Sequence, residues 1–503
     1  MTHATDQASR EIWFLTGSQH LYGDETLKQV AENSRRIVAG IDGSGALPVK
    51  IVCKPILTGP DEIRDVCLAA NAAPECAGVV TWMHTFSPAK MWIAGLTRLQ
   101  KPLAHLHTQF NSELPWGEID MDFMNLNQSA HGDREYGFIA ARLRLKRKIV
   151  VGHWQDPDVL QDLAQWANSA LAMAESRSLK IARFGGMNMR EVAVTGGDRV
   201  EAQIQLGWSV NGYGVGDLAG RVNEVSDAAV DRQVEEYEES YVVSAPLRRG
   251  GEKRENLRYA ARQELGMRAF LDEGGFAAFT TTFEDLHGLK QLPGFACQRL
   301  MAQGYGFGAE GDWKTAALVR LGKVMTGRRS GGVSFMEDYT YHLVKGQERI
   351  LGAHMLEVCP SIADAKPALE VHPLGIGGKA DPPRLVFTAR PGPAVNATLV
   401  DMGGRMRLIV AELDVVTPEH AMPKLPTARA VWIPRPDFKR GAQGWLEAGG
   451  AHHAAFCQGV TYEEWEDFGA MAGLEVIRLG ADLDLRALRN ELRWNDAAFK
   501  LGL

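Results

Sequence analysis

The segment CAGVVTWMHTFSPAKMWIAGLTRLQKPLAHLHTQ (residues 76–109) shows how the first part of the chain is organised. Its two apolar runs, 76–84 and 101–109, have the length and composition of buried strands, and residues 88–99 between them have the spacing of a helix. Buried strand, helix and buried strand in this order are typical of a parallel βαβ unit. We therefore expect a parallel sheet covered by helices.

The same alternation continues on both sides of this segment. Further strands are expected at 11–17, 47–56 and 148–154, and helices at 25–41, 60–72 and 133–147. Ligands of such sheets meet the loops at the carboxyl ends of the strands, which places residues 17–20, His84 and His107 at one edge. The sequence thus predicts a first α/β domain over residues 1–175.

Two further domains follow in the pattern of the chain. Strands at 179–186, 191–194 and 276–283 with a helix around 312–325 predict a second α/β domain over residues 176–327. Beyond it, segments separated by Gly, Pro and Asp are expected to form strands at 334–344, 349–359, 384–390, 405–416 and 428–434, followed by a helix near 461–472 and a strand at 474–478. These predict a β-rich third domain over residues 328–503.

The composition is that of a folded protein without a nucleic-acid partner. Apolar residues make up 45% and charged residues 23% of the 503 residues. The 55 basic and 62 acidic residues give a net charge of −7, which favours neither nucleic acid nor an anionic membrane. The first residues lack a signal-peptide pattern and no stretch has the apolar length of a membrane helix, so we expect a cytoplasmic protein.

The string GFGAEG (306–311) satisfies the G-x-G-x-x-G pattern of dinucleotide-binding loops. Such a loop must follow a strand, whereas residues 293–303 before it have a helical pattern. We therefore expect no dinucleotide site, which argues against an oxidoreductase. A non-catalytic sugar receptor is a second alternative, and the absence of a secretory signal disfavours it.

Two glutamates stand in unusual settings. Glu310 lies in a glycine-rich stretch whose backbone can approach a ligand closely, although a surface acid would fit there too. Strand alternation places Glu337 on one face with Phe335, Tyr339 and Tyr341. A carboxylate among aromatic rings is paired, metal-bound or raised in pKa, unless it lies at the edge of a hairpin.

Three histidines are candidates for a site. His354 is expected in the middle of a strand beside Leu356, where a core histidine is the common alternative. His452 and His453 follow two glycines at the start of a strand, and adjacent side chains of an extended chain face opposite ways. At most one of the two is then expected to point into a site. The residues alone do not show whether these side chains and the glutamates converge.

Several long strings resemble the L-arabinose isomerase family. They are FLTGSQHLYG (14–23), MNLNQSAHGDREYGF (124–138), FTTTFEDLHGLKQLPG (279–294), QGYGFGAEGDWKTAALVR (303–320), SFMEDYTYH (334–342), LGAHMLEVCPSI (351–362) and GGAHHAAF (449–456). The resemblance runs from residue 11 to the carboxyl terminus. It implies an α/β fold of two Rossmann-like α/β domains followed by a β-rich, barrel-like C-terminal domain. It also implies a metal-dependent aldose–ketose isomerase that converts L-arabinose to L-ribulose through a cis-enediolate, and D-galactose to D-tagatose.

The resemblance also implies the site residues. One divalent metal, usually Mn²⁺ with Co²⁺ or Fe²⁺ as alternatives, is expected on Glu310, Glu337, His354 and His453, with motif position favouring His453 over His452. The two glutamates are then the catalytic proton carriers. Expected substrate contacts are Gln19, Met187 and Phe283, while Gln128 and His131 reach a neighbouring subunit's site in a homohexamer. A relative acting on L-fucose would share this fold and metal site.

Overall fold

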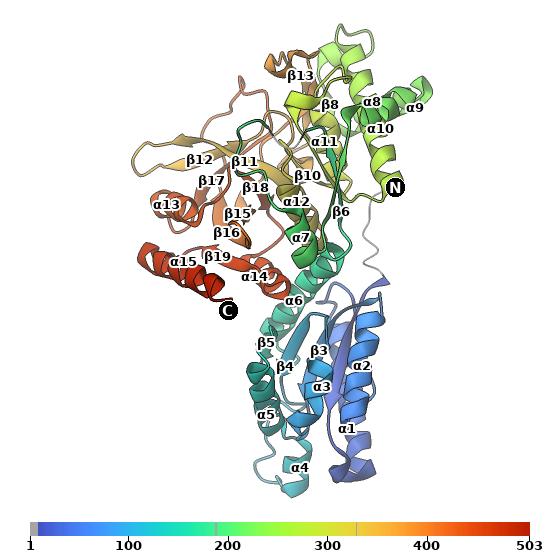
Figure 1. Ribbon diagram of the computed structural model, residues 1–503, viewed down its shortest axis with the longest axis vertical. Helices are drawn as coiled ribbons and strands as arrows, with labels where there is room; N and C mark the ends of the chain where they lie inside the picture. The colour runs from blue at the N-terminus through green and yellow to red at the C-terminus, as the bar shows by residue number, and fades with distance from the viewer. Residues whose placement is uncertain (1–8, 187–188, 328, 503) are drawn as a thin grey trace. The chain divides into compact units, whose positions relative to one another are not determined.

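The computed structural model describes residues 9–186, 189–327 and 329–502 (Figure 1). The chain divides into two compact units. The N-terminal unit contains the described residues up to Ala174 together with Glu466–Ala472, and the larger unit contains Glu175–Trp465 and Gly473–Leu503. No helix among the described residues is long and apolar enough to cross a membrane.

The N-terminal unit is built on a five-stranded parallel sheet of order β2-β1-β3-β4-β5, the order of one class of doubly wound folds. Its strands are β1 (Glu11–Gly17), β2 (Lys50–Cys53), β3 (Cys76–Met83), β4 (Leu103–His107) and β5 (Lys148–Val151). Its main helices are α1 (Gly23–Gly43), α2 (Pro60–Ala72), α3 (Ile93–Leu96), α4 (Met121–Leu126), α5 (Ser129–Arg142) and α6 (Pro157–Ser176). The central strand β3 is buried along its whole length, which explains its unbroken apolar sequence.

A second parallel sheet, of order β10-β9-β6-β7, begins the larger unit. Its strands are β6 (Lys180–Phe184), β7 (Ser209–Tyr213), β9 (Ala278–Thr281) and β10 (Gly306–Gly308). The helices are α7 (Arg199–Leu206), α8 (Val215–Glu224), α9 (Asp227–Ser240), α10 (Arg254–Gly274), α11 (Gly294–Ala302) and α12 (Trp313–Thr326). The strand expected at 191–194 is wrong. The buried Lys314 ammonium, and not a neighbouring strand, binds the carbonyl oxygens of Val194 and Thr195.

The glycines of GFGAEG serve helix packing. Gly306 and Gly308 lie within β10, and helix α11 precedes them as expected. A Cβ atom at Gly306 would collide with the carbonyl oxygen of Ala316, and one at Gly308 would collide with that of Asp312. Glycine is therefore required here so that the start of α12 can lie directly on β10.

The remainder of the larger unit is β-rich. Strands β11 (Val333–His342), β12 (Arg349–Ala353), β17 (Arg429–Pro434), β16 (Met406–Val415), β15 (Gly392–Asp401) and β18 (His453–Cys457) follow one another in space. Because β15 pairs with both β16 and β18, these six strands form a closed ring, and β19 (Glu475–Leu479) adds to β16. This ring confirms the barrel-like third part, and the two parallel sheets confirm the α/β fold class.

Smaller elements complete the β-rich part. A three-stranded sheet joins β8 (Val242–Val243), β13 (Ala368–Val371) and β14 (Pro383–Val386). Helices α13 (Phe438–Ala448), α14 (Tyr462–Ala472) and α15 (Leu485–Lys500) also occur in this part of the chain. Of these three helices only α14 was expected from the sequence.

Candidate active site

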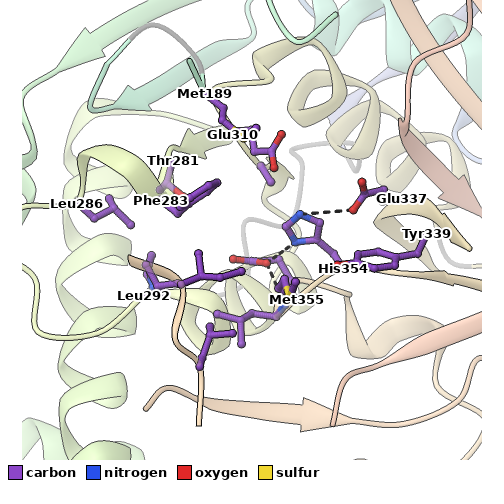
Figure 2. A pocket seen from close by; sticks show the side chains of 16 residues that line it. Met189, Thr281, Phe283, Leu286, Leu292, Glu310, Glu337, Tyr339, His354 and Met355 are labelled. Atoms are coloured by element: carbon purple, nitrogen blue, oxygen red, sulfur yellow. Dashed lines mark hydrogen bonds and ion pairs between the residues drawn. The ribbon is translucent and has the colours of Figure 1, made fainter. Parts of the chain in front are cut away.

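Glu310, Glu337 and His354 line a cavity of about 250 Å³ in the larger unit, and His453 lies close to Glu310 and His354. Glu310 lies between β10 and α12, Glu337 on β11 and His354 directly after β12, while His453 is the first residue of β18. Figure 2 shows the side chains of Glu310, Glu337 and His354 directed toward a common space. The position of His354 corrects the expectation that it lies in the middle of a strand, because β12 ends at Ala353.

The backbone of Glu310 has an uncommon conformation. Its φ is +58°, in the left-handed region that residues other than glycine rarely adopt. The next residue but one, Asp312, begins α12 by accepting a hydrogen bond from the Thr315 amide at 3.0 Å. The short turn between β10 and α12 therefore holds the Glu310 carboxylate at the cavity wall. Strained backbone conformations cluster at active sites and ligand-binding segments.

Strand pairing brings Glu337 to its partners. In the antiparallel register Glu337 lies opposite His453 of β18 on one side and opposite Ala353 of β12 on the other. The residue after Ala353 is His354. The pairing of β11 therefore places Glu337 close to both His354 and His453.

The expected alternation along β11 is wrong beyond Asp338. The register shifts between Asp338 and Thr340, which interrupts the period of two. Tyr339 still lines the cavity, but the Tyr341 ring packs against Phe438 at 5.1 Å between centroids. Only part of the aromatic face predicted around Glu337 therefore belongs to the site.

The polar atoms of this group, which we call the inner cluster (Glu310, Glu337, His354 and His453), lie close together. One ligand atom from each of Glu310, His354 and His453 lies within 4.8 Å of the others. The fourth member, Glu337, has a carboxylate oxygen 3.9 Å from His354 Nε2.

His452 also faces this cluster. Its Nε2 is 3.7 Å from a Glu310 oxygen, and that of His453 is 3.8 Å from the same oxygen. The expectation that at most one of these histidines points into the site is therefore wrong. His452 precedes β18 in a bend, so strand alternation does not apply to it.

Each imidazole of the inner cluster is held from behind by a buried carboxylate. His354 Nδ1 is 2.6 Å from Glu357, and His453 Nδ1 is 3.1 Å from Asp312. When Nδ1 of a neutral ring donates to its carboxylate, the Nε2 lone pair is directed at the cluster. His453 Nε2 is buried and has no hydrogen-bond partner among the described residues. Sequence reasoning missed Glu357 and Asp312, and their short spacing from His354 and Glu310 was the only available signal.

Electrostatics keep the Glu310 and Asp312 carboxylates charged. Burial raises the pKa of Glu310, but the nearby imidazoles outweigh it and the pKa is lowered overall. Burial likewise opposes the ionisation of Asp312, yet Lys314 and His453 bring its pKa down to about 2. Burial also lowers the pKa of His453, which keeps the ring neutral. Charged carboxylates beside inward imidazole lone pairs form a donor set that fits Mn²⁺, Co²⁺ or Fe²⁺ better than Mg²⁺ or Ca²⁺.

The residues expected to contact substrate are distributed over both units. Phe283 is the first residue of a short 3-10 helix (Phe283–Asp285) after β9 and lines the cavity. Met187 lies outside the described residues. The other three, Gln19, Gln128 and His131, belong to the N-terminal unit and remain predictions.

Within the N-terminal unit, Gln19 follows β1 and Gln128 immediately precedes α5. The Tyr22 hydroxyl donates to the Gln128 side chain at 3.4 Å. His131 is exposed, and its ring packs on Phe86 with 4.5 Å between centroids. The three predicted residues thus present polar groups on the surface of their unit.

The chain matches known proteins over nearly its whole length. Models of the N-terminal, central and C-terminal domains of L-arabinose isomerase match residues 6–178, 180–328 and 332–475. The chain belongs to the L-arabinose isomerase family. The L-arabinose isomerase of Geobacillus stearothermophilus is 61% identical over 97% of this chain and 98% of its own length. Those of Herpetosiphon aurantiacus and Serratia proteamaculans are 60% and 56% identical, over 99% and 98% of both chains.

Proposed function

We propose that the protein interconverts L-arabinose and L-ribulose in this cavity, with one divalent metal ion, Mn²⁺ by preference, held by the inner cluster. The observation that supports this most strongly is the fixed direction of the two imidazoles, whose Nδ1 atoms are engaged by Glu357 and Asp312. When bound, the ion stabilises the negative charge that develops on the two sugar oxygens.

The chemistry left to the protein is proton transfer. Moving the carbonyl group from C1 to C2 requires removal of the C2 proton, passage through a cis-enediolate and return of a proton to C1. The lowered pKa of Glu310 keeps it ionised and able to accept a proton at neutral pH. Glu337 lines the same cavity and serves the second carbon. A well-placed general base of this kind accelerates a reaction by about 10²- to 10⁴-fold.

Removal of metal tests the proposal. We expect dialysis against EDTA to abolish isomerisation of L-arabinose and Mn²⁺ to restore it. Mg²⁺ is the control ion and is expected to restore less activity, since a donor set with imidazoles suits it poorly. Full turnover in protein shown by elemental analysis to be free of transition metals would contradict the proposal.

Solvent exchange tests the two glutamates as proton carriers. In D₂O a proton taken up by a carboxylate can exchange before it returns, whereas a hydride shifted directly between carbons cannot. L-Ribulose formed in D₂O is therefore expected to carry deuterium at C1, in part if the cavity closes against water. Complete retention of protium at C1, with transfer of a C2 deuterium label to C1, would assign the glutamates to metal binding alone.

The proposed substrate range includes D-galactose, which would give D-tagatose. D-Galactose has the C2 to C4 configuration of L-arabinose and adds one hydroxymethyl group. We expect a lower kcat/KM for D-galactose than for L-arabinose because this group must be accommodated beyond the reacting carbons. L-Fucose provides the comparison, and a higher kcat/KM for L-fucose would place the enzyme with the fucose-specific relatives.

The proposed assembly is a homohexamer in the cytoplasm, in which Gln128 and His131 contribute to a neighbour's site. The family resemblance supports this, together with the exposed position of His131 and the partly exposed position of Gln128. Co-expression of His131→Ala and Glu310→Gln chains is expected to restore part of the activity that each variant lacks, because mixed assemblies contain some intact sites. An active monomer by light scattering, or no recovery in verified mixed assemblies, would contradict the shared site.

A further inference from the structure

The N-terminal unit contains another histidine and carboxylate group, which we call the second cluster (His105, His107 and Asp133). His105 and His107 are two residues apart on β4, so both imidazoles lie on the same face of the strand. Asp133 comes from α5, which packs against that strand. His105 Nε2 is 2.8 Å from one Asp133 oxygen and His107 Nδ1 is 2.7 Å from the other.

The carboxylate of this cluster lacks a permanent cationic partner. The Asp133 side chain is only 1% exposed. Besides the two imidazoles it accepts a bond from the Met83 amide at 3.3 Å, and no lysine or arginine of the described chain pairs with it. Burying a carboxylate without a compensating charge is costly. The hydrogen bond to Asp133 raises the pKa of His107, so a proton on this imidazole now supplies part of the compensating charge. A bound cation would supply the charge in place of that proton.

We propose that His105, His107 and Asp133 bind a divalent transition-metal cation of the Zn²⁺ type, at a site made of residues that the inner cluster does not use. One ligand atom from each residue lies within 4.8 Å of the others. Two imidazole nitrogens and one carboxylate oxygen are a common ligand set for zinc and iron in proteins. The His107 side chain is 33% exposed, so that the ion can enter and water can complete its coordination.

Binding requires a small local rearrangement. Tetrahedral coordination at about 2.0–2.1 Å places ligand atoms roughly 3.3 Å apart, wider than the present contacts of 2.7 and 2.8 Å. Each imidazole then binds the metal through the nitrogen that now faces Asp133, keeps one proton on its other nitrogen and releases any second proton to water, and the side chains separate by about half an ångström. The bound ion links β4 to α5, and by mass action it stabilises the N-terminal unit.

The test counts Zn²⁺ on a full-length chain that lacks the imidazoles of the inner cluster. We expect the His354→Gln/His453→Gln variant to bind one Zn²⁺ per chain in equilibrium dialysis with elemental analysis. Adding His107→Gln should weaken this binding at least tenfold. Adding His153→Gln instead, which changes a partly exposed histidine of the same unit, should leave it unchanged. Because the inner cluster is disabled throughout, the result does not depend on the proposed isomerase function.

Spectroscopy distinguishes ligation from adventitious binding. The partly exposed position of His107 favours a folded His107→Gln variant, which circular dichroism verifies. Zinc X-ray absorption of the parent variant is expected to show two imidazole ligands, and cobalt loading a visible spectrum of low coordination number. Absence of stoichiometric Zn²⁺ in the parent, or unchanged binding after His107→Gln, would show that the cluster is a hydrogen-bonded network only.

Discussion

The inner cluster and the second cluster use the same kinds of side chain in different arrangements. In the inner cluster each imidazole has a carboxylate of its own behind it, Glu357 for His354 and Asp312 for His453. In the second cluster a single carboxylate, Asp133, is both the expected metal ligand and the hydrogen-bond partner of the two imidazoles. The first arrangement leaves the inward nitrogens ready for a ligand, whereas the second must break hydrogen bonds before it binds one. An outer carboxylate therefore distinguishes a preorganised metal site from a merely possible one.

The largest effect is expected from the inner glutamates. Glu310→Gln and Glu337→Gln should each lower kcat by about 10²- to 10⁴-fold, because an amide neither accepts a proton nor balances the charge of a metal. Glu25→Gln is the matched control, since the Glu25 side chain is 93% exposed on α1. Steady-state kinetics on L-arabinose measure the change. Near wild-type turnover in either variant would remove that residue from proton transfer.

The comparison extends to His84, a buried histidine without a carboxylate. It follows β3, and its Nε2 contacts the Asn33 side chain at 2.8 Å. Burial lowers its pKa to about 4. The folded state therefore binds fewer protons than the unfolded state, so stability is complete above pH 6.5 and falls as the pH drops toward 4. Relative to the ordinary imidazole pKa of 6.5, the loss of stability amounts to about 3 kcal/mol.

The acid sensitivity attributed to His84 is measurable as local stability. Hydrogen exchange in β3 should become faster between pH 6.5 and pH 4.5, after correction for the intrinsic exchange rate. The His84→Gln variant should show a smaller loss over this range, because glutamine does not titrate. An equal loss in both proteins would mean that His84 does not control the acid stability of the N-terminal unit.

A smaller effect is expected from the outer carboxylates. Asp312→Asn and Glu357→Gln should each weaken Mn²⁺ binding about 10- to 100-fold, or roughly 1.4–2.8 kcal/mol. The reason is that the imidazole hydrogen-bonded to each carboxylate loses its charged partner. Titration calorimetry on metal-free protein measures this. Glu370→Gln is the matched control, since Glu370 holds His372 at 2.6 Å on β13 and lines no part of the cavity. Equal affinity in all three variants would contradict the role of the outer carboxylates.

Much of the fold was predictable because buried strands and helices have apolar residues at regular spacing in the sequence. The apolar run at 76–84 became the fully buried β3, and the glycines at 306 and 308 marked a close approach of helix and strand. The elements that were missed include the largely buried ten-residue strand β15 and helix α10 as well as short or surface segments. Residues 191–194 are too few to distinguish a strand from a turn, and α15 presents most of its side chains to solvent.

The amino-acid sequence by itself determined the fold class, the family and the identity of the candidate ligands. Only the tertiary structure brought those ligands together, because the register of β11 with β18 and β12 decides that Glu337 lies beside His453 and next to His354. It also supplied Asp312 and Glu357 as outer carboxylates and placed Asp133 between two histidines of β4. The physical reason is that hydrogen-bond partners depend on strand register and side-chain direction, which act between residues far apart in the chain.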